Sequence, residues 1–230
     1  MTRFTEALAN GPVIAEIKPR TADGEDLLRG RDPVAIAAAY AAAGATCLSV
    51  VTGHWFGGTV DLLRQVASVS PLPVLRKDFI TRSAHIDTAV DAGAAAVLLT
   101  AKLLTAGAMG RLIDAALARG LTPFVEVTDE AEIAMVSRPA ECVIAVNNKD
   151  IGTRERGPAD LGRGTDLLAA VRATGTELPV SASGIEKPGQ AAELLAAGYR
   201  GLLVGTALLR AADPAEWFAE LSGELARPVR

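Results

Sequence analysis

Residues 73–127 read PVLRKDFITRSAHIDTAVDAGAAAVLLTAKLLTAGAMGRLIDAALARGLTPFVEV, and this segment sets the pattern of the whole chain. It contains three short apolar runs, 73–75, 96–99 and 122–127, separated by two Ala- and Leu-rich runs with helical spacing. The apolar runs show little polar alternation, which is typical of parallel strands buried on both faces. A glycine follows each helical run, as expected where a helix ends. The segment therefore predicts strands and helices that alternate in a parallel sheet.

The same alternation continues in both directions and gives eight strand–helix pairs in 230 residues. The predicted strands are 13–17, 47–51, 73–75, 96–99, 122–127, 142–146, 179–182 and 201–204. The predicted helices are 33–43, 59–69, 84–92, 106–119, 129–136, 166–174, 188–197 and 214–225. This count predicts an α/β protein: a single (β/α)₈ TIM barrel over 1–230 with a parallel eight-stranded core, in which 1–12 form a short N-terminal segment. A doubly wound open sheet is the alternative, but no G-x-G-x-x-G motif follows the first strand.

Composition narrows the class of protein further. Lys plus Arg number 23 and Asp plus Glu 27, so the net charge of −4 gives no electrostatic case for binding nucleic acid or an anionic membrane. No apolar run approaches the roughly 20 residues of a membrane span, and the first residues lack the apolar region of a secretory signal. The two cysteines, Cys47 and Cys142, lie in apolar runs and are predicted to be buried free thiols. We therefore expect a cytoplasmic globular protein.

The distribution of lysines points to the strand ends. In a (β/α)₈ barrel the chemistry sits where strands end and the following loops begin. The chain has only five lysines, which lie after the first, third, fourth, sixth and seventh predicted strands: Lys18, Lys77, Lys102, Lys149 and Lys187. Chance placement in polar loops is the alternative, but arginine would serve there equally and cannot donate a proton. The pattern favours a functional role for Lys18 and Lys77 most strongly.

Carboxylates accompany these lysines. Glu16 and Lys18 stand two residues apart on the first strand and so point to the same face. A charged pair at the end of an apolar strand is costly unless it contacts a ligand or a partner charge, and a structural ion pair closing the barrel mouth is the alternative. The same reasoning applies to Glu126 at the end of the fifth strand. The residues that flank Lys77 would lower its pKa enough for proton donation, with Asp78 as a supporting group or a reactant.

Small and polar residues at three further strand ends indicate a phosphate. Ser183-Gly184 and Gly205-Thr206 follow the last two strands and let backbone N–H groups face an anion. Residues 147–150, NNKD, are too polar for turn chemistry alone.

Aromatic residues 54–56, HWF, follow the second strand and would stack on an aromatic substrate or anchor a loop on the barrel rim. The two histidines form no metal-binding pattern, and no nucleophile elbow or P-loop is present. The residues therefore predict a barrel enzyme that performs lysine–glutamate acid–base chemistry on a small phosphorylated substrate, without a metal.

Six motifs occur in order at matching strand ends: AEIK at 15–18, FGG at 56–58, LRKDF at 75–79, VEV at 125–127, NNKD at 147–150 and SGI at 183–185. Together they resemble the indole-3-glycerol phosphate synthase family of tryptophan biosynthesis, and the resemblance extends from about residue 12 to residue 221. That family closes the indole ring on carboxyphenylamino-deoxyribulose phosphate and loses carbon dioxide and water. The resemblance implies a carbon–carbon lyase that needs no cofactor.

The resemblance also implies roles for single residues. Lys77 would be the general acid that polarises the ribulose carbonyl, and Lys18 would hold the substrate carboxylate or phosphate. Glu126 and Glu16 would transfer protons during dehydration, assisted by Asn147. The other implied site residues are Thr21, Lys149, Ser183, Gly184, Gly205 and Thr206 around the phosphate, and Phe56 and Phe79 along the aromatic ring.

The chain departs from the family pattern at several positions. Ala182 stands where the family usually has Glu, Lys149 where it has Arg, and Gly53 where it has Asp. Only twelve residues precede the first strand, where the family has an N-terminal extension. Two alternatives therefore stay open: a paralogue that acts on a related aminodeoxy-ketose phosphate with altered chemistry, and a non-catalytic ligand-binding barrel. The matched acids and bases favour the synthase. Monomer and homodimer are equally compatible with the sequence.

Overall fold

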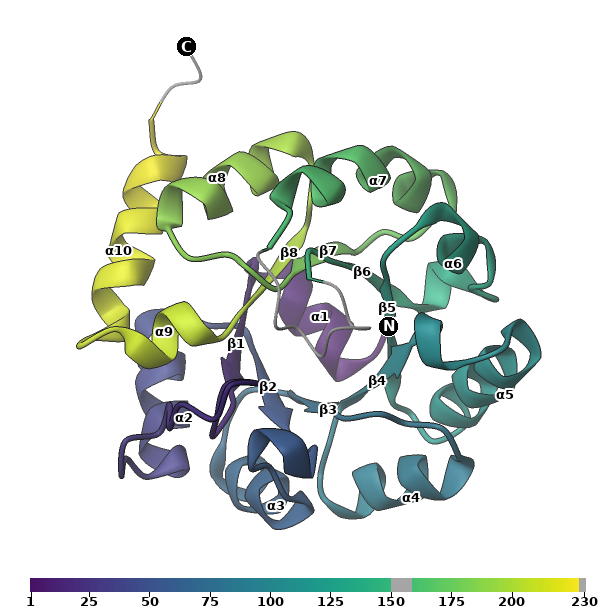
Figure 1. Ribbon diagram of the computed structural model, residues 1–230, viewed down its shortest axis with the longest axis horizontal. Coiled ribbons are helices and arrows are strands. Elements are labelled where there is room, and N and C mark those ends of the chain that lie inside the picture. Colours follow the sequence, from purple (N-terminus) through teal and green to yellow (C-terminus); the bar gives the residue numbers. More distant parts are fainter. Residues whose placement is uncertain (150–158, 228–230) are drawn as a thin grey trace.

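Eight parallel strands form a closed barrel in the computed structural model, which describes residues 1–149 and 159–227 (Figure 1). Each strand pairs with its neighbours in chain order, and β8 pairs with β1 to close the ring. The strands are β1 (Val13–Ile17), β2 (Cys47–Val51), β3 (Val74–Lys77), β4 (Ala96–Thr100), β5 (Thr122–Val127), β6 (Val143–Asn147), β7 (Pro179–Ala182) and β8 (Gly201–Val204). The predicted (β/α)₈ barrel is confirmed.

Helices surround the barrel on its outside (Figure 1). They are α2 (Pro33–Ala43), α3 (Val60–Val69), α4 (Ser83–Asp91), α5 (Ala106–Leu117), α6 (Glu130–Ala134), α7 (Leu161–Ala173), α8 (Pro188–Ala197) and α10 (Pro214–Leu225). Shorter elements are α9 (Thr206–Arg210) and the 3₁₀ turns η1 (His54–Phe56), η2 (Ala101–Leu103) and η3 (Pro139–Glu141). No helix in the two described ranges combines the length and the apolar character that crossing a membrane requires.

Local sequence explains where several helices begin. Asp32 precedes Pro33 and accepts a hydrogen bond from the N–H of Val34 at the start of α2. Asp213 accepts in the same way from the N–H of Ala215 at the start of α10. Proline fits the first helical turn because its missing N–H has no partner there in any case. The helix starts predicted at these two Asp-Pro pairs are confirmed.

One predicted helix boundary is wrong by five residues. The spacing predicted a helix over 166–174, whereas α7 begins at Leu161. Asp160 caps this earlier start by accepting a hydrogen bond from the N–H of Arg163. Gly164 lies in the first turns and is required for packing, because a Cβ there would lie 2.9 Å from Asn148 Oδ1. From the sequence alone a glycine here argues against a helix, whereas in the structure its lack of a side chain makes room for Asn148.

Smaller differences concern other element ends. The third and fourth strands extend beyond the predicted ends to Lys77 and Thr100, and β6 covers Val143–Asn147 where 142–146 was predicted. Polar residues at these strand ends still pair with a neighbouring strand. The helices predicted over 59–69, 84–92, 106–119 and 129–136 are each displaced by one or two residues at an end.

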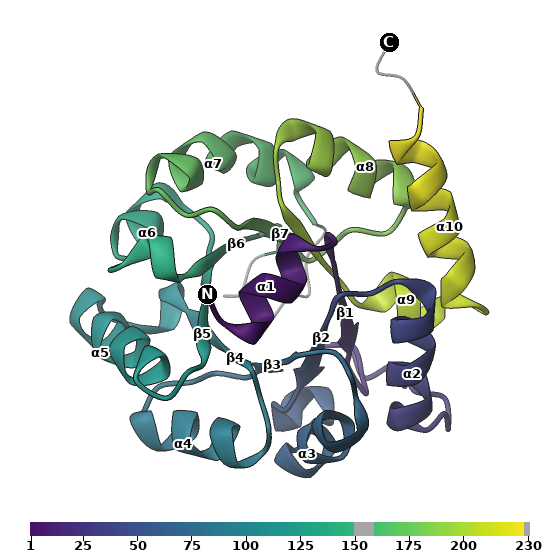
Figure 2. The same cartoon turned by 180° about the vertical axis from the view of Figure 1, so that it is seen from behind.

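The short N-terminal segment predicted over 1–12 contains the helix α1 (Arg3–Ala9), for which no helix was predicted and which covers one end of the barrel. It lies across the barrel centre in both views and is nearer the viewer in Figure 2. Phe4 is fully buried, and its ring meets Phe124 edge-on with centroids 6.3 Å apart. Its carbonyl accepts from Cys47 Sγ at the first residue of β2. The helix therefore plugs the amino-terminal ends of the strands.

Side chains fill the barrel interior and leave the carboxyl ends of the strands as the site of the cavities described next. The interior layer includes Ile14, Leu75, Leu98, Phe124 and Leu203, all buried. A second apolar layer lies between the strands and the outer helices. Both cysteines are buried free thiols, as predicted, and burial raises the pKa of each to about 12.

Candidate active site

Two cavities lie at the carboxyl ends of the strands. The polar cavity has a volume of about 260 Å³, and its lining includes Lys18, Thr21, Lys149, Ser183, Gly184, Gly205 and Thr206. The aromatic cavity has a volume of about 420 Å³, and its lining includes His54, Trp55, Phe56, Lys77, Phe79 and Glu126. Every phosphate-site and ring-site residue predicted from the sequence therefore lines one cavity or the other. Asp150, the last residue of the predicted polar motif, lies outside the described residues.

Glu16 joins the two cavities. Its Oε1 lies 3.5 Å from Lys18 Nζ, and its Oε2 lies 3.7 Å from Lys77 Nζ. Ser49 Oγ donates to Oε2 at 3.4 Å. Only 3% of Glu16 and 8% of each lysine is exposed, so these charges are largely removed from water. Such a cluster is expensive to bury unless the charges compensate one another or meet a ligand.

The Glu16 side chain has room because a glycine follows β8, the strand that pairs with β1 and closes the barrel. A Cβ on Gly205, which follows β8, would lie 2.8 Å from Glu16 Oε1. The glycine that the sequence suggested for a phosphate therefore has a second reason to be there. Any side chain at this position would displace the carboxylate that faces both lysines.

Glu126 and Lys77 share the aromatic cavity. Glu126 stands near the end of β5, is 2% exposed and pairs in register with Thr100 of β4. The predicted acid–base residues Glu16, Lys18, Lys77 and Glu126 thus come together from β1, β3 and β5 and the segment directly after β1.

Asp78 also lines the aromatic cavity, but its carboxylate is held by two neighbouring side chains. Its Oδ2 accepts from Thr52 Oγ1 at 2.7 Å and from Arg76 Nη2 at 3.0 Å. Arg76 also donates to the carbonyl of His85 in α4 at 2.8 Å, so the pair ties β3 to its following helix. This network supports the interpretation of Asp78 as a structural partner. The ion pair between Lys77 and Glu16 could not be predicted from their positions in the sequence, because the two residues lie on different strands.

Asn147 ends β6 as a fully buried side chain. Its Oδ1 accepts from the N–H of Lys149 at 2.9 Å, and its Nδ2 has no hydrogen-bond partner among residues 1–149 and 159–227. A buried amide donor without a partner is costly unless a ligand accepts from it. Arg163 Nη1 supports this turn by donating to the carbonyls of Asn147 and Lys149 at 3.1 and 3.3 Å. Sequence reasoning missed Arg163, because its contact depends on the docking of α7.

The segment after β7 turns sharply at the polar cavity. Ser183 has a φ of 70° and Gly184 a φ of 74°. A residue with a side chain rarely adopts the first of these values, so the surrounding structure must hold it. Thr21, across the cavity, accepts a hydrogen bond from the N–H of Glu25 at 3.1 Å and so shapes its own loop as well as lining the cavity.

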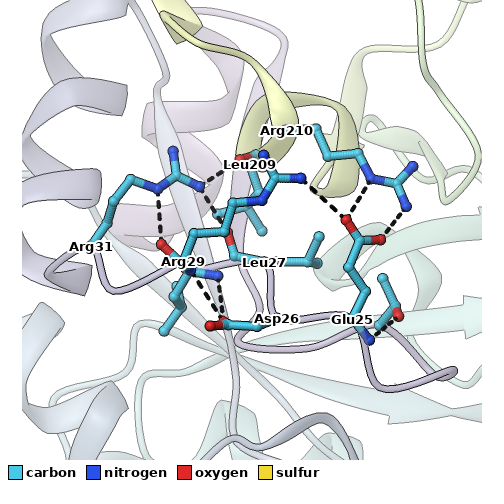
Figure 3. Close-up of polar contacts among 9 residues, drawn as sticks. Glu25, Asp26, Leu27, Arg29, Arg31, Leu209 and Arg210 are labelled. Atoms are coloured by element: carbon cyan, nitrogen blue, oxygen red, sulfur yellow. Dashed lines mark hydrogen bonds and ion pairs between the residues drawn. The ribbon is translucent and has the colours of Figure 1, made fainter.

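An ion pair at the rim of the polar cavity connects the loop after β1 to α9 (Figure 3). Glu25 accepts from Arg210 Nη2 at 2.5 Å and from Arg29 Nη2 at 3.3 Å. Arg31 donates to the carbonyls of Leu27 and Leu209. The hydrogen bond from Arg210 lowers the pKa of the Glu25 carboxyl. No sequence pattern indicates this contact, since 185 positions separate Glu25 from Arg210.

Stacked rings form a wall of the aromatic cavity. Trp55 and Phe79 are stacked, with centroids 4.9 Å apart and planes 24° from parallel. Lys18 Nζ lies 5.6 Å from the centroid of the Phe56 ring. A Cβ on Gly53 would lie 3.1 Å from the Trp55 ring, so the glycine leaves room for the indole. The HWF segment therefore contributes to a ligand-sized cavity.

The sequence comparisons with known proteins indicate one family. The sequence model of the family described as indole-3-glycerol phosphate synthase matches residues 1–221. A relative of that name from Pyrococcus furiosus is 37% identical over 217 residues, which cover 94% of this chain and 93% of the relative. Another from Thermococcus kodakarensis is 35% identical over 225 residues, covering 96% of each chain. Among solved structures, 3-hexulose-6-phosphate synthase from Salmonella typhimurium is similar with a TM-score of 0.71 over 94% of this chain and 98% of its own; at 17% identity this likeness shows the fold alone.

Proposed function

The chain belongs to the indole-3-glycerol phosphate synthase family, and from that membership we propose that its site closes the indole ring of carboxyphenylamino-deoxyribulose phosphate by lysine–glutamate acid–base catalysis. The family assignment confirms the resemblance and the lyase class predicted from the sequence. The observation that carries the mechanism is Glu16, whose carboxylate faces both Lys18 and Lys77 where the two cavities meet.

The two cavities match the two ends of this substrate. Its carboxyphenyl ring would enter the aromatic cavity beside Phe56 and Phe79, while its phosphate would enter the polar cavity beside Lys18 and Lys149. The backbone of Ser183-Gly184 and of Gly205-Thr206 would supply further donors to the phosphate. In this orientation the ribulose carbonyl lies between the cavities, next to Lys77.

Ring closure requires a proton at the carbonyl oxygen. The ring carbon that carries the carboxylate bonds to the carbonyl carbon, and Lys77 delivers its proton to the oxygen, which becomes a hydroxyl. The carboxylate then leaves as carbon dioxide, and its bonding electrons restore the aromatic ring. Lys18 attracts the substrate carboxylate or phosphate and holds it in place.

Dehydration requires one acid and one base. Glu126 or Glu16 donates a proton to the new hydroxyl, which leaves as water, and the other carboxylate removes a proton from the adjacent carbon to form the double bond. The buried Nδ2 of Asn147 is a donor suited to orient the hydroxyl. The step is balanced: the acid loses the proton that leaves with the water, and the base gains the proton that the substrate carbon loses.

A second candidate is a paralogue that acts on a related aminodeoxy-ketose phosphate, and Ala182 is the observation that favours it. Ala182 is fully buried in the barrel interior and pairs in register with Asn147. The carboxylate that the family usually has there would lie next to Asn147 at the site. Its absence removes one ligand contact while leaving the acids and bases of ring closure in place.

Mixing the purified protein with carboxyphenylamino-deoxyribulose phosphate tests the proposal. We expect indole fluorescence to rise and the product mass to correspond to loss of one carbon dioxide and one water. Tight binding without product, or a product that retains its carboxylate, would favour the paralogue with altered chemistry. Neither binding nor turnover would contradict both enzymatic readings.

A further inference from the structure

Asn148 is fully buried between two residues of the proposed site, yet it lines neither cavity. Its N–H donates to the carbonyl of Ala182 at 2.9 Å, and its carbonyl accepts from the N–H of Asp160 at 2.8 Å. Asp160 caps α7. The backbone of Asn148 therefore connects the end of β7 with the start of α7, behind the polar cavity.

The side chain of Asn148 forms hydrogen bonds with the residues on either side of Ala182. Its Nδ2 donates to Ser181 Oγ at 3.0 Å and to the carbonyl of Ser183 at 2.9 Å. A carbonyl can only accept, so the nitrogen of the amide must be the atom that faces Ser183. On the other side, a Cβ on Gly164 would lie 2.9 Å from Asn148 Oδ1, and the glycine leaves room for this oxygen.

The contact with Ser183 fixes the direction of a peptide group. In a planar trans peptide the C=O and the following N–H point in opposite directions. Asn148 keeps the Ser183 carbonyl turned toward the buried side, so the N–H of Gly184 points away from Asn148. Ser183 and Gly184 both line the polar cavity. Within the described ranges no backbone carbonyl accepts a hydrogen bond from the Gly184 N–H.

The backbone at this turn needs support from outside. Ser183 and Gly184 both have positive φ values, and Ser183 carries a side chain. A Cβ on Gly184 would lie 2.0 Å from the Cβ of Ala159, so the turn packs directly on the residue before Asp160. Asn148 contacts both sides of this arrangement, through Ser183 and through Asp160.

From these contacts we propose that Asn148 is a positioning residue that aims the Gly184 N–H at the substrate phosphate. The inference rests on the proposed function, which assigns the phosphate to the polar cavity. It predicts that Asn148 affects phosphate affinity and not ring closure, since Lys77, which donates the proton of that step, lies in the other cavity.

Two substitutions at Asn148 and one matched control test the proposal. Asn148→Asp keeps the shape but replaces the donor with an oxygen that repels the Ser183 carbonyl, and Asn148→Ala removes the side chain. Ser181→Ala removes the other acceptor of the same Nδ2 and leaves the Ser183 contact intact. Titration with inorganic phosphate, read by calorimetry and by the ¹⁵N–¹H signal of Gly184, measures the effect in the folded protein without turnover.

We expect both Asn148 variants to bind inorganic phosphate about tenfold more weakly, the loss expected for one hydrogen bond to a charged group, and to raise KM similarly with kcat within about threefold. Ser181→Ala should stay within about twofold of the wild type, and its Gly184 signal should still shift with phosphate. Folded Asn148 variants with wild-type phosphate affinity would overturn the proposal. So would an equal loss in Ser181→Ala, which would mark a general packing effect. A wild type that binds phosphate in this Asn148-dependent way but forms no indole would overturn the proposed function alone.

Discussion

Among single residues, Glu16 has the central place in the site, because its negative charge faces two lysines. Its two carboxylate oxygens face different lysines, at 3.5 and 3.7 Å, and this arrangement keeps two cations close together in a buried place. In the proposed ring closure, transfer of the Lys77 proton to the substrate leaves Glu16 and Lys18 as a compensated pair. The proposed step therefore separates little net charge within the barrel mouth.

Replacing Lys77 tests its role as the proton donor. Lys77→Ala should lower kcat by about 10² to 10⁴, the usual contribution of a general acid, because the variant lacks the group that is proposed to protonate the carbonyl oxygen. Circular dichroism and thermal unfolding would show whether the fold is retained. Lys187→Ala is the matched control, since Lys187 is exposed at the start of α8. An active, folded Lys77→Ala protein would rule out the proposed acid.

Ala182→Glu tests the significance of the missing carboxylate. The new side chain would extend from the end of β7 beside Asn147 and supply an acceptor for a substrate hydroxyl. We expect kcat/KM for carboxyphenylamino-deoxyribulose phosphate to rise about tenfold, in line with one hydrogen bond to a charged group. Ala182→Gln separates charge from size. If Glu gives no gain over Gln, the alanine is not the cause of any lowered activity.

Sequence patterns could predict the residues whose role depends on their own strand. Glu16, Lys18, Lys77 and Glu126 interrupt or end apolar runs, and that interruption is visible in one dimension. The roles of Arg163, Asn148 and the pair Glu25–Arg210 depend on which loop lies against which helix. No spacing rule contains this information, because the partners come together only in the folded barrel.

At the scale of elements, the two ends of the barrel have different tasks. The helix α1 closes the amino-terminal end with Phe4 and Leu8, both buried. At the carboxyl end, the loop after β1 is fastened to α9 through Glu25 and Arg210 (Figure 3). The amino-terminal end is thus filled by a helix, while the carboxyl end carries the loops that line both cavities, which is typical of this fold.

Phe4→Ala tests the plug. It should lower the free energy of unfolding by about 3–5 kcal/mol, because it leaves a cavity against Phe124, and it should leave kcat unchanged at a temperature where the variant is folded. Glu6→Ala, on the exposed face of the same helix, should change little. Chemical denaturation together with turnover measures both quantities. A large fall in kcat without loss of stability would mean that α1 acts on the site.

Glu25→Gln tests the contact between the loop and α9 through its pH dependence. Arg210 lowers the pKa of Glu25 below its usual value of 4.5, so the pair stabilises the fold above that value and the contribution is lost as pH falls through the lowered pKa. The difference in Tm between wild type and Glu25→Gln should therefore be largest near neutral pH and shrink below about pH 4.5. Glu220→Gln, exposed on α10, serves as the control. A Tm difference that does not change with pH would contradict the ion pair as its cause.

The eight helices that alternate with the strands were predictable, and the two short helices outside this alternation were not. The bounds of α2, α8 and α10 follow from Asp-Pro or Lys-Pro starts and from periodic Ala and Leu, as predicted. The seven-residue α1 and the five-residue α9 were missed. Isolated helices of this length are marginal, and packing on the barrel stabilises them. The predicted start of α7 was wrong for a different reason: Gly164 is typical of a helix end, and only its packing against Asn148 explains it inside the helix.

At the scale of the whole molecule, alternation of strands and helices brings distant residues to one end of a closed ring. Glu16 near the start of the chain and Gly205 near its end meet because β8 pairs with β1. Strand count and strand order were predictable, because parallel strands with crossover helices admit few arrangements. The two cavities could not be predicted from the sequence, since loops after the strands shape them. Together these features suit a substrate with a ring at one end and a phosphate at the other.

The most direct test uses carboxyphenylamino-deoxyribulose phosphate that carries ¹³C in its carboxyl group. Labelled carbon dioxide and indole-3-glycerol phosphate are measured in the same reaction mixture by mass spectrometry. If the site performs both ring closure and dehydration, the two products form in equal amounts and at the same rate in the wild type, and both form about 10² to 10⁴ times more slowly in Lys77→Ala. Labelled carbon dioxide without indole, or substrate that is bound but keeps its label, would contradict the proposed reaction.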